Sequence, residues 1–221
     1  MHYLSCMVLT KHKLLAIFYG LLCHGVFIVA GAVMFLTILT GFQFSVGAFE
    51  GFSAVAINFL LLIQFPVGHS FFLSKRGMKI LEIFAPKSYA KSLRTTVYAT
   101  IASMQLILLF SLWNFSGVFI WNIETPANMV MILLNLLSWA LLSVSSIQAG
   151  YKVQTGSLGW TSVFQGKEPV FPDMPVRGMF SIIRQPIYLS FSLVLWTSPQ
   201  MSVDLFIVAL SYSLYCYFGP K

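Results

Sequence analysis

Apolar residues occur along the chain in long runs, and short segments that hold most of the charges separate these runs. A helix needs about 20 consecutive apolar residues to cross roughly 30 Å of hydrocarbon. Four runs reach this length and are predicted to span a membrane, at 14–39, 48–73, 95–115 and 127–148.

A fifth apolar region, at 187–218, is too long for a single span and is interrupted by Ser198-Pro199-Gln200. Proline lacks a backbone donor and its ring clashes with the preceding turn, so the interruption predicts two antiparallel helices joined by a tight turn. The first of these helices has only about 11 residues, or roughly 17 Å. We therefore expect it to be tilted, shielded by other helices or extended by the residues before it. Six spans result.

The positions of the basic residues favour the same number of spans. With six antiparallel helices, all 13 lysines and arginines fall on one side of the membrane, because the opposite loops, at about 40–47, 116–126 and 199–202, contain none. By the positive-inside rule this side is the cytoplasm. We therefore expect a multi-pass protein of a bacterial inner membrane, with both termini cytoplasmic.

The composition supports a membrane protein. Apolar residues make up 58% of the chain and charged residues 9%, against roughly 25% charged residues in an average soluble domain. We therefore expect an all-α polytopic protein whose solvent is the bilayer. The net charge of +7 lies in short loops, which favours topology signals and anionic lipid headgroups over a nucleic-acid partner. The three cysteines have no metal-ligand spacing, so neither a metal site nor a disulfide framework is expected.

The domain organisation follows from the same runs. We expect one membrane domain over residues 1–221, with a four-helix scaffold at 1–148, a cytoplasmic connector at 149–186 and a terminal helical hairpin at 187–218. The connector is rich in glycine and proline, which predicts a tightly turning backbone. It also contains large aromatic residues, which seek burial and argue against disorder. A long loop that is not disordered is usually functional.

Polar residues inside the predicted spans are costly in hydrocarbon and are expected to face the interior of the bundle. Three amides are predicted to hydrogen-bond between helices: Asn58, Gln64 and Asn135. His24 is expected to do the same as a neutral imidazole. Gln148, next to the connector, is the best candidate among the amides for a role in a site. Asp204 is most simply interpreted as a charge at the start of the last helix.

The segment Arg184-Gln185-Pro186-Ile187-Tyr188 lies where the basic connector meets the hairpin. Pro186 suits the first turn of a helix, where its missing N–H is not needed. A helix N-terminus attracts anions, and Arg184 adds a permanent charge with planar, bidentate geometry. The segment therefore predicts a site for a carboxylate or a phosphate. The alternative interpretation is a topology-determining arginine followed by a helix-starting proline and an interfacial tyrosine.

The wider segment from Gly178 to Tyr188 has the pattern G-x-F-x-x-x-R-Q-P-x-Y and resembles the G-x-Y-x-x-x-R-H-P-x-Y signature of the integral-membrane methyltransferases. This group includes isoprenylcysteine carboxyl methyltransferases, phospholipid N-methyltransferases, methanethiol S-methyltransferases and NnrU-like proteins. Three more segments, within roughly 55–218, resemble the methanethiol S-methyltransferase branch. They are Gly68-His69-Ser70, similar to its Q-H-S, Arg94-Thr95-Thr96-Val97-Tyr98, similar to its R-S-T-Y-V, and Trp196-Thr197-Ser198-Pro199-Gln200-Met201, similar to its W-A-T-P-x-M.

The resemblance implies a methyltransferase that uses S-adenosylmethionine and acts on a small thiol or a lipophilic acceptor. It implies that the cofactor lies in a cytoplasm-facing pocket formed by the connector and the hairpin, while the acceptor enters from the bilayer. His69 and Arg94 would line or orient the acceptor. The residues expected to bind the cofactor are Gly178, Arg184, Gln185, Pro186, Tyr188 and Gln148. Displacement at an already activated methyl group needs mainly positioning and exclusion of water, so few acids and bases are required.

Two departures from the family pattern leave other functions open. Gln185 stands where the family has histidine, and an amide cannot titrate or donate as an imidazolium does. The family pattern continues beyond the hairpin with a Glu-Arg-containing segment, whereas residues 205–221 contain no acid. The alternative function is a non-catalytic accessory or assembly subunit on the same scaffold, with membrane proteins as partners. A small-molecule transporter ranks third, because no span carries paired charges or a symmetric repeat.

Overall fold

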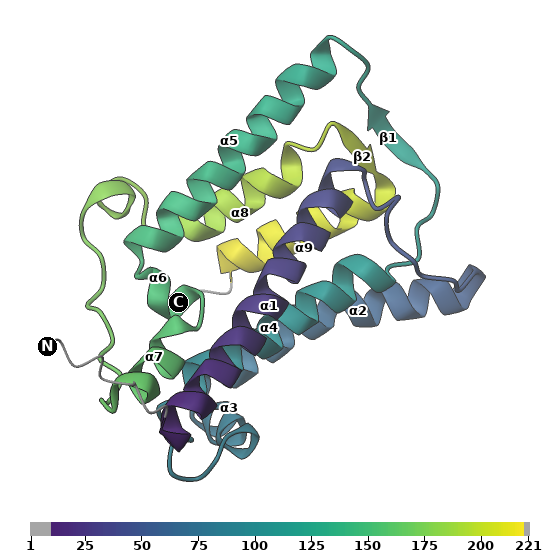
Figure 1. The fold of residues 1–221 in the computed structure, drawn as a ribbon. Coiled ribbons are helices and arrows are strands. Elements are labelled where there is room, and N and C mark those ends of the chain that lie inside the picture. The colour runs from purple at the N-terminus through teal and green to yellow at the C-terminus, as the bar shows by residue number, and fades with distance from the viewer. Residues whose placement is uncertain (1–9, 219–221) are drawn as a thin grey trace, which may run out of the picture.

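The computed structural model describes residues 10–218, which form a bundle of helices (Figure 1). Six helices correspond to the six predicted spans: α1 (Lys11–Leu39), α2 (Gly51–Leu73), α4 (Arg94–Leu112), α5 (Ala127–Gln148), α8 (Pro186–Trp196) and α9 (Val203–Phe218). Four of these, α1, α2, α4 and α5, are long and apolar enough to cross a membrane, and α8 and α9 are shorter apolar helices. The prediction of an all-α polytopic membrane protein is confirmed.

Shorter elements fill the connections between these helices. A short helix α3 (Lys75–Leu81) and a 3-10 helix η1 (Glu82–Phe84) follow α2, and α6 (Tyr151–Gln154), α7 (Ser157–Gln165) and the 3-10 helix η2 (Gly178–Ser181) lie in the predicted connector. Two short strands, β1 (Phe119–Asn122) and β2 (Gln200–Ser202), form an antiparallel pair in which Asn122 lies opposite Gln200. This strand pair was not predicted, because each strand is too short to show a period.

The helices pack in two groups that share one apolar core. In the first group α4 packs against both α1 and α2, and in the second α8 packs against both α5 and α9. Fully buried side chains from α1, α4, α8 and α9 join the groups, among them Ile38, Phe110, Leu195 and Leu205. The packing of α8 between two helices explains how so short an apolar helix is accommodated, because its neighbours shield it from lipid.

The hairpin between α8 and α9 turns where the proline predicts it. The Ser198 hydroxyl donates to the Ile38 carbonyl at 2.6 Å, and Trp121 Nε1 donates to the Ser198 carbonyl at 3.1 Å. Asn135 Nδ2 donates to the Val194 carbonyl at 2.9 Å, which satisfies a carbonyl in the last turn of α8. The segment that resembles W-A-T-P-x-M therefore builds the turn and ties it to α1, β1 and α5.

Amide side chains attach α2 to α4, as the sequence predicts. Gln64 Nε2 donates to the Gln105 carbonyl at 2.9 Å, and Gln105 Nε2 donates to the Gln64 carbonyl at 2.8 Å. Nearer the start of α2, Asn58 Nδ2 donates to the Asn114 carbonyl at 2.8 Å. Because α2 has no fully buried residue, these polar pairs supply much of the specificity of its packing.

The first part of the connector packs onto the bundle through α7. Trp160 Nε1 donates to His24 Nε2 at 3.1 Å, which confirms the predicted hydrogen bond of this histidine between helices. The Trp160 ring lies so close to Gly20 that a Cβ there would approach it to 2.8 Å. Trp160 N also donates to Thr96 Oγ1 at 2.9 Å. A tryptophan expected to seek burial therefore attaches the connector to α1 and α4.

Asp204 lies at the start of the last helix, as expected, but its carboxylate is also buried and hydrogen-bonded. It lies in the first turn of α9 and is only 4% exposed. One carboxylate oxygen accepts from Trp113 Nε1 at 2.8 Å, and the other accepts from the backbone N and hydroxyl of Ser116 at 2.9 and 2.6 Å. The carboxylate thus joins the loop after α4 to the start of α9. Its burial was not expected from the sequence, because the partners lie about 90 residues away along the chain.

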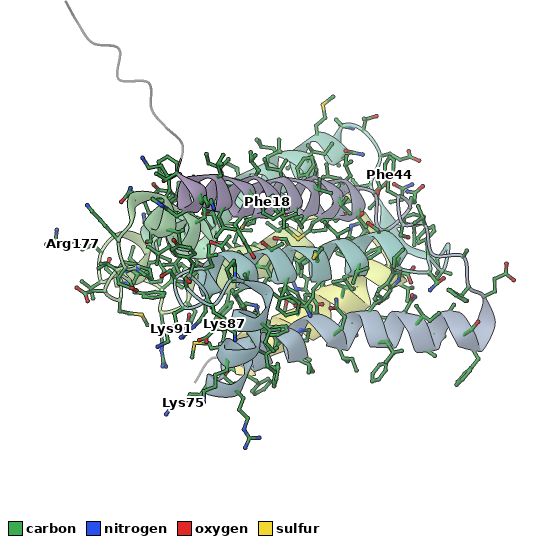
Figure 2. All side chains as sticks on the ribbon, turned by 60° about the horizontal axis from the view of Figure 1, so that its bottom comes forward. Phe18, Phe44, Lys75, Lys87, Lys91 and Arg177 are labelled. Atoms are coloured by element: carbon green, nitrogen blue, oxygen red, sulfur yellow. The ribbon has the colours of Figure 1, made fainter. Side chains whose placement is uncertain are left out.

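The basic residues gather at one end of the molecule. Figure 2 shows Lys75, Lys87, Lys91 and Arg177 at this end, and Phe44 near the other. We call it the basic end; α1, α4 and α8 begin there, and α2, α5 and α9 finish there. The opposite end carries the β1–β2 pair and the Asp204 network (Figure 1).

Candidate functional site

Four helices each bring a polar aromatic side chain to the basic end. His69 lies in the last turns of α2, Tyr98 in the second turn of α4, Tyr188 in the first turn of α8 and Tyr215 in the last turn of α9. We call these four residues the His69–tyrosine cluster. Since each helix contributes from its terminal turns, the cluster lies near one surface of the bundle and not at its centre.

The closest contact in the cluster joins His69 to Tyr98. The Tyr98 hydroxyl lies 2.6 Å from Nδ1 of His69 and 3.2 Å from Nε2, and the two ring centroids are 5.5 Å apart. On its other side the imidazole packs against the Phe65 ring at 5.4 Å. A histidine held in this way has a fixed ring orientation, and an imidazole nitrogen can accept a proton from a thiol or a hydroxyl.

Two further tyrosines complete the cluster. Tyr188 and Tyr215 come to the same end of the bundle from α8 and α9, which pack against each other. Tyr215 Oη is also 3.0 Å from the Ser70 hydroxyl, so α9 is linked to the residue that follows His69. Two of the segments that resemble the methyltransferases, G-H-S and R-T-T-V-Y, therefore meet here, and R-Q-P-I-Y lies at the same end of the bundle, although the three are far apart in the sequence.

Tyr188 connects the cluster to the predicted anion site. Pro186 is the first residue of α8 and is buried, and the side chain of Gln185 makes no cap hydrogen bond to the helix. Arg184 is exposed, and among residues 10–218 its side chain forms no hydrogen bond or ion pair. The N-terminus of α8 and the Arg184 guanidinium therefore both retain donors for an anionic ligand.

Gln148 and Gly178 contact each other. Gly178 has a φ of +64°, and a Cβ on it would lie 2.6 Å from Gln148 Oε1. The same oxygen accepts from the backbone N of Met179 at 2.8 Å. The close approach expected at Gly178 is thus made by the Gln148 side chain, which holds η2 against the end of α5. Direct contact of either residue with a cofactor stays a prediction.

Arg94 has a partner that the sequence did not indicate. Its Nη2 lies 2.6 Å from Glu82 Oε1 in an ion pair that is partly exposed, while its Nε is buried without a partner within the described part of the chain. Arg94 precedes Tyr98 by four residues and shares its face of α4. Its described ion pair is with η1 and not with His69, so a role in orienting the acceptor stays a prediction.

The sequence alone does not single out Tyr98, Tyr215 or Glu82 as residues of the basic end. Tyr98 ends the segment that begins with Arg94, so a signal was present in the four-residue spacing. Tyr215 lies among other aromatic residues at the end of α9 and has no distinguishing spacing. The roles of Tyr98 and Tyr215 in the cluster become clear only when the packing of the neighbouring helices is known.

A pocket lies at the opposite end of the bundle, between the start of α2, the loop after α4 and the start of α9. Its polar lining includes Asn58, Asn114 and Asp204. Asn58 Oδ1 accepts from the backbone N of Asn114 at 2.8 Å, and Asn114 Oδ1 accepts from the backbone N of Phe49 at 2.7 Å. These polar atoms bond to one another, which favours a structural role over ligand binding.

Known relatives support the resemblance seen in the motifs. The chain is 28% identical over 217 residues to methanethiol S-methyltransferase 1 of Bradyrhizobium diazoefficiens, a match that covers 94% of this chain and 73% of the relative. It is 26% identical over 200 residues to methanethiol S-methyltransferase of Mycobacterium tuberculosis, covering 83% and 80%. It is 27% identical over 175 residues to methanethiol S-methyltransferase of Pseudomonas deceptionensis, covering 76% of this chain and 63% of that protein. No family model and no solved structure matches. The predicted similarity to the methanethiol S-methyltransferase-like group is confirmed.

Proposed function

We propose that this protein is a membrane-embedded methyltransferase that transfers the methyl group of S-adenosylmethionine to a small thiol at its basic end. The observation that carries the proposal is the 2.6 Å contact between His69 and Tyr98, at the end of the bundle where α8 begins with Tyr188 in its first turn. It unites two segments that resemble the same enzymes. In this proposal the basic end and both termini face the cytoplasm, in keeping with the positive-inside rule.

The residues at the start of α8 fit S-adenosylmethionine. Its carboxylate suits the N-terminus of α8, which the Gln185 side chain does not cap, and the guanidinium of Arg184, which has no partner among residues 10–218. Gln185 supplies an amide for a further hydrogen bond. Its positively charged sulfur suits the face of an aromatic ring such as that of Tyr188. When bound, the cofactor supplies a methyl group on a sulfonium, already activated toward displacement. Gln148 and Gly178 would act by holding the η2 segment that leads to Arg184.

His69 would prepare the acceptor. A thiol attacks carbon far more readily as the thiolate, so its S–H proton must be removed. In this proposal an imidazole nitrogen of His69 takes that proton, and the Tyr98 hydroxyl holds the ring in the orientation that the transfer needs. Arg94, one helical turn away, would add a positive charge near the thiolate.

The surroundings of His69 suit a small apolar acceptor and exclude water. Aromatic rings continue from Phe65 to Tyr212, with centroids 5.9 Å apart, and from Tyr212 to Phe191, at 6.2 Å. These residues belong to α2, α9 and α8, so the wall is built from three of the apolar helices. An acceptor dissolved in the bilayer would reach His69 along this wall. The other acceptor class implied by the family, a larger lipophilic molecule, would use the same route.

Cofactor binding and turnover by the purified full chain test the proposal. Wild-type protein in detergent is expected to bind S-adenosylmethionine saturably and to convert methanethiol to dimethyl sulfide. Arg184→Ala is expected to weaken binding roughly 10-fold or more, because a charge-assisted hydrogen bond contributes about 1.5–3 kcal/mol. Arg177→Ala, which removes an exposed arginine from the same connector, is the matched control and is expected to bind normally. Absence of saturable binding by folded wild-type protein would overturn the proposal.

Gln185 favours a second candidate, the non-catalytic accessory or assembly subunit. An amide at the position of the family's histidine keeps hydrogen bonding but loses the charge of an imidazolium. This function predicts cofactor binding without turnover of any thiol, or no binding at all. Gln185→His separates the two functions, since a gain of methyl transfer in this variant alone would show that the natural chain is catalytically silent.

A further inference from the structure

A pocket at the basic end is lined mainly by cations, and Arg94 alone among its lining residues has a part in the proposed transfer. Its lining residues are Lys75, Met78, Lys79, Glu82, Lys91 and Arg94. They come from α3, from η1, from the turns before α4 and from the first residue of α4. We call this the basic pocket. Figure 2 shows Lys75 and Lys91 extending from the ribbon on the same side of the molecule.

The backbone around Ser74 holds the lysines of α3 in place. The Ser74 hydroxyl accepts from the backbone N of Gly77 at 3.1 Å, which caps α3 immediately after α2 ends. Gly77 is buried against the end of α2, where its missing Cβ leaves room for the Phe71 carbonyl. Lys75 and Lys79, four residues apart, therefore share one face of a helix whose direction is fixed.

The charges of the basic pocket do not balance. Four cationic side chains surround one carboxylate, and Glu82 already pairs with Arg94 at 2.6 Å. The remaining lysines have no ion pair within the part of the chain that the structure describes. The Arg94 Nε is buried there without a partner. Like charges held close together repel one another, so a bound anion would stabilise this arrangement.

Apolar residues beside the pocket indicate where the anion comes from. In the same α3–η1 segment, Ile83 is 77% exposed and Phe84 is 57% exposed. The segment is also tied to α1, because the Tyr19 hydroxyl donates to the Phe84 carbonyl at 2.7 Å. A fixed segment with lysines on one side and exposed apolar side chains on the other has the character of a structure lying in the headgroup region of a bilayer. A free phosphate would use the cations alone.

We infer that the basic pocket binds the phosphate headgroup of an anionic phospholipid. Lys75, Lys79 and Lys91 contact the phosphate oxygens, and the acyl chains lie beside Ile83 and Phe84. Arg94 keeps its ion pair with Glu82 and adds its positive charge beside the same headgroup. The lipid thereby fixes the start of α4, one helical turn before Tyr98.

Lipid binding by the purified full chain tests this inference independently of catalysis. Wild-type protein in mixed micelles is titrated with phosphatidylglycerol and with phosphatidylcholine, and bound lipid is counted by native mass spectrometry. Phosphatidylglycerol is expected to bind roughly 10-fold more tightly or better, because each basic residue near an anionic surface adds several-fold to affinity. Inorganic phosphate in the millimolar range is expected to displace little of it.

A triple variant identifies the pocket. Lys75→Gln, Lys79→Gln and Lys91→Gln together are expected to remove the preference for phosphatidylglycerol. The matched control removes three exposed lysines elsewhere at the basic end, Lys87→Gln, Lys152→Gln and Lys167→Gln, and is expected to keep it. Equal losses in the two triple variants would mean a diffuse charge effect and would overturn the inference.

Complete displacement of the lipid by inorganic phosphate would also overturn the inference, in favour of a site for a free anion. If the pocket triple fails to fold, the single changes at Lys79 and Lys91 are each expected to reduce the preference severalfold.

Discussion

The opposite end and the basic end of the bundle each contain polar side chains between apolar helices. At the opposite end both oxygens of the Asp204 carboxylate accept hydrogen bonds, from Trp113 and from Ser116. Asn58 and Asn114 are bonded to each other through side chain and backbone. Every one of these groups has its partner inside the protein, so the network connects segments of the chain and offers little to a ligand.

At the basic end, fewer of the polar groups have partners within the described part of the protein. Arg184 has no partner among the described residues, Gln185 does not cap α8, and the Nε of Arg94 is buried without an acceptor. His69 is held by Tyr98 and lies beside the aromatic rings of Phe65 and Tyr212. The comparison teaches that a charged group bonded within the protein, such as Asp204, serves the scaffold, whereas Arg184 stays available to a ligand. Buried uncharged atoms without a partner among the described residues also occur in the scaffold, on Gln105, Asn135 and Trp139, so they do not mark a site by themselves.

The largest effect is expected from His69→Ala. If this histidine is the base, the change should lower kcat/KM roughly 10²–10⁴-fold, the usual contribution of general acid–base catalysis. The affinity for S-adenosylmethionine and the melting temperature should stay close to wild type. Methanethiol turnover, cofactor titration and thermal unfolding of one preparation measure all three. The matched control is His12→Ala, since His12 lies at the start of α1, where its side chain hydrogen-bonds only Thr10 among residues 10–218.

Tyr98→Phe separates positioning from a general loss of packing. It removes only the hydroxyl that contacts His69 and should lower kcat several-fold with little change in KM, as expected for about 1 kcal/mol from one hydrogen bond. Tyr217→Phe makes the same chemical change on a side chain that is 79% exposed, and should have no effect. A normal kcat in Tyr98→Phe would remove the hydrogen bond from the proposed mechanism.

The opposite end should respond in stability and not in chemistry. Asp204→Ala leaves Trp113 and Ser116 with unsatisfied donors and is expected to cost about 2–4 kcal/mol, because each buried unsatisfied group costs about 1–3 kcal/mol. The measurement is thermal unfolding in detergent, with Asp173→Ala, an exposed acid in the connector, as control. The protein that remains folded should turn over at the normal rate. A folded Asp204→Ala protein without activity would contradict the separation of the two ends.

Much of the fold could be predicted because membrane helices leave a local record in the sequence. The apolar runs located the six helices to within a few residues, and Pro199 located the hairpin turn. Polar side chains need hydrogen-bond partners in hydrocarbon, and this requirement correctly predicted that Gln64 and Asn135 face neighbouring helices. The two short strands and the burial of Asp204 could not be predicted, since both depend on which loops meet at the opposite end.

The candidate site was predictable only in parts. The segment from Arg184 to Tyr188 has local properties, a fixed charge and a helix start, that can be recognised without neighbours. The meeting of His69 with Tyr98 depends on the packing of α2 against α4, which apolar periodicity does not specify. The resemblance of the motifs also did not distinguish segments of the candidate site from segments of the scaffold. The hairpin segment from Trp196 to Met201 forms hydrogen bonds within the scaffold, whereas His69 joins the cluster.

The smallest and most specific effect is expected from Gly178→Ala. The positive φ alone should cost about 1 kcal/mol, and the new Cβ would also press on Gln148 Oε1. Gly166→Ala has nearly the same φ, +65°, with no atom near the added Cβ, so it measures the backbone cost alone. Gly178→Ala should therefore lower the melting temperature and the affinity for S-adenosylmethionine more than Gly166→Ala does, and the difference should report the displacement of the connector.

A double variant tests the contact between Gly178 and Gln148. Gln148→Ala removes the side chain that the new Cβ would meet, so the loss of stability in the double variant should be smaller than the sum of the two single losses by at least about 0.5 kcal/mol. Strict additivity would mean that Gln148 does not hold the connector, and would leave the hydrogen bond from the Ser145 hydroxyl to Met179 Sδ, at 3.4 Å, as a link between α5 and η2.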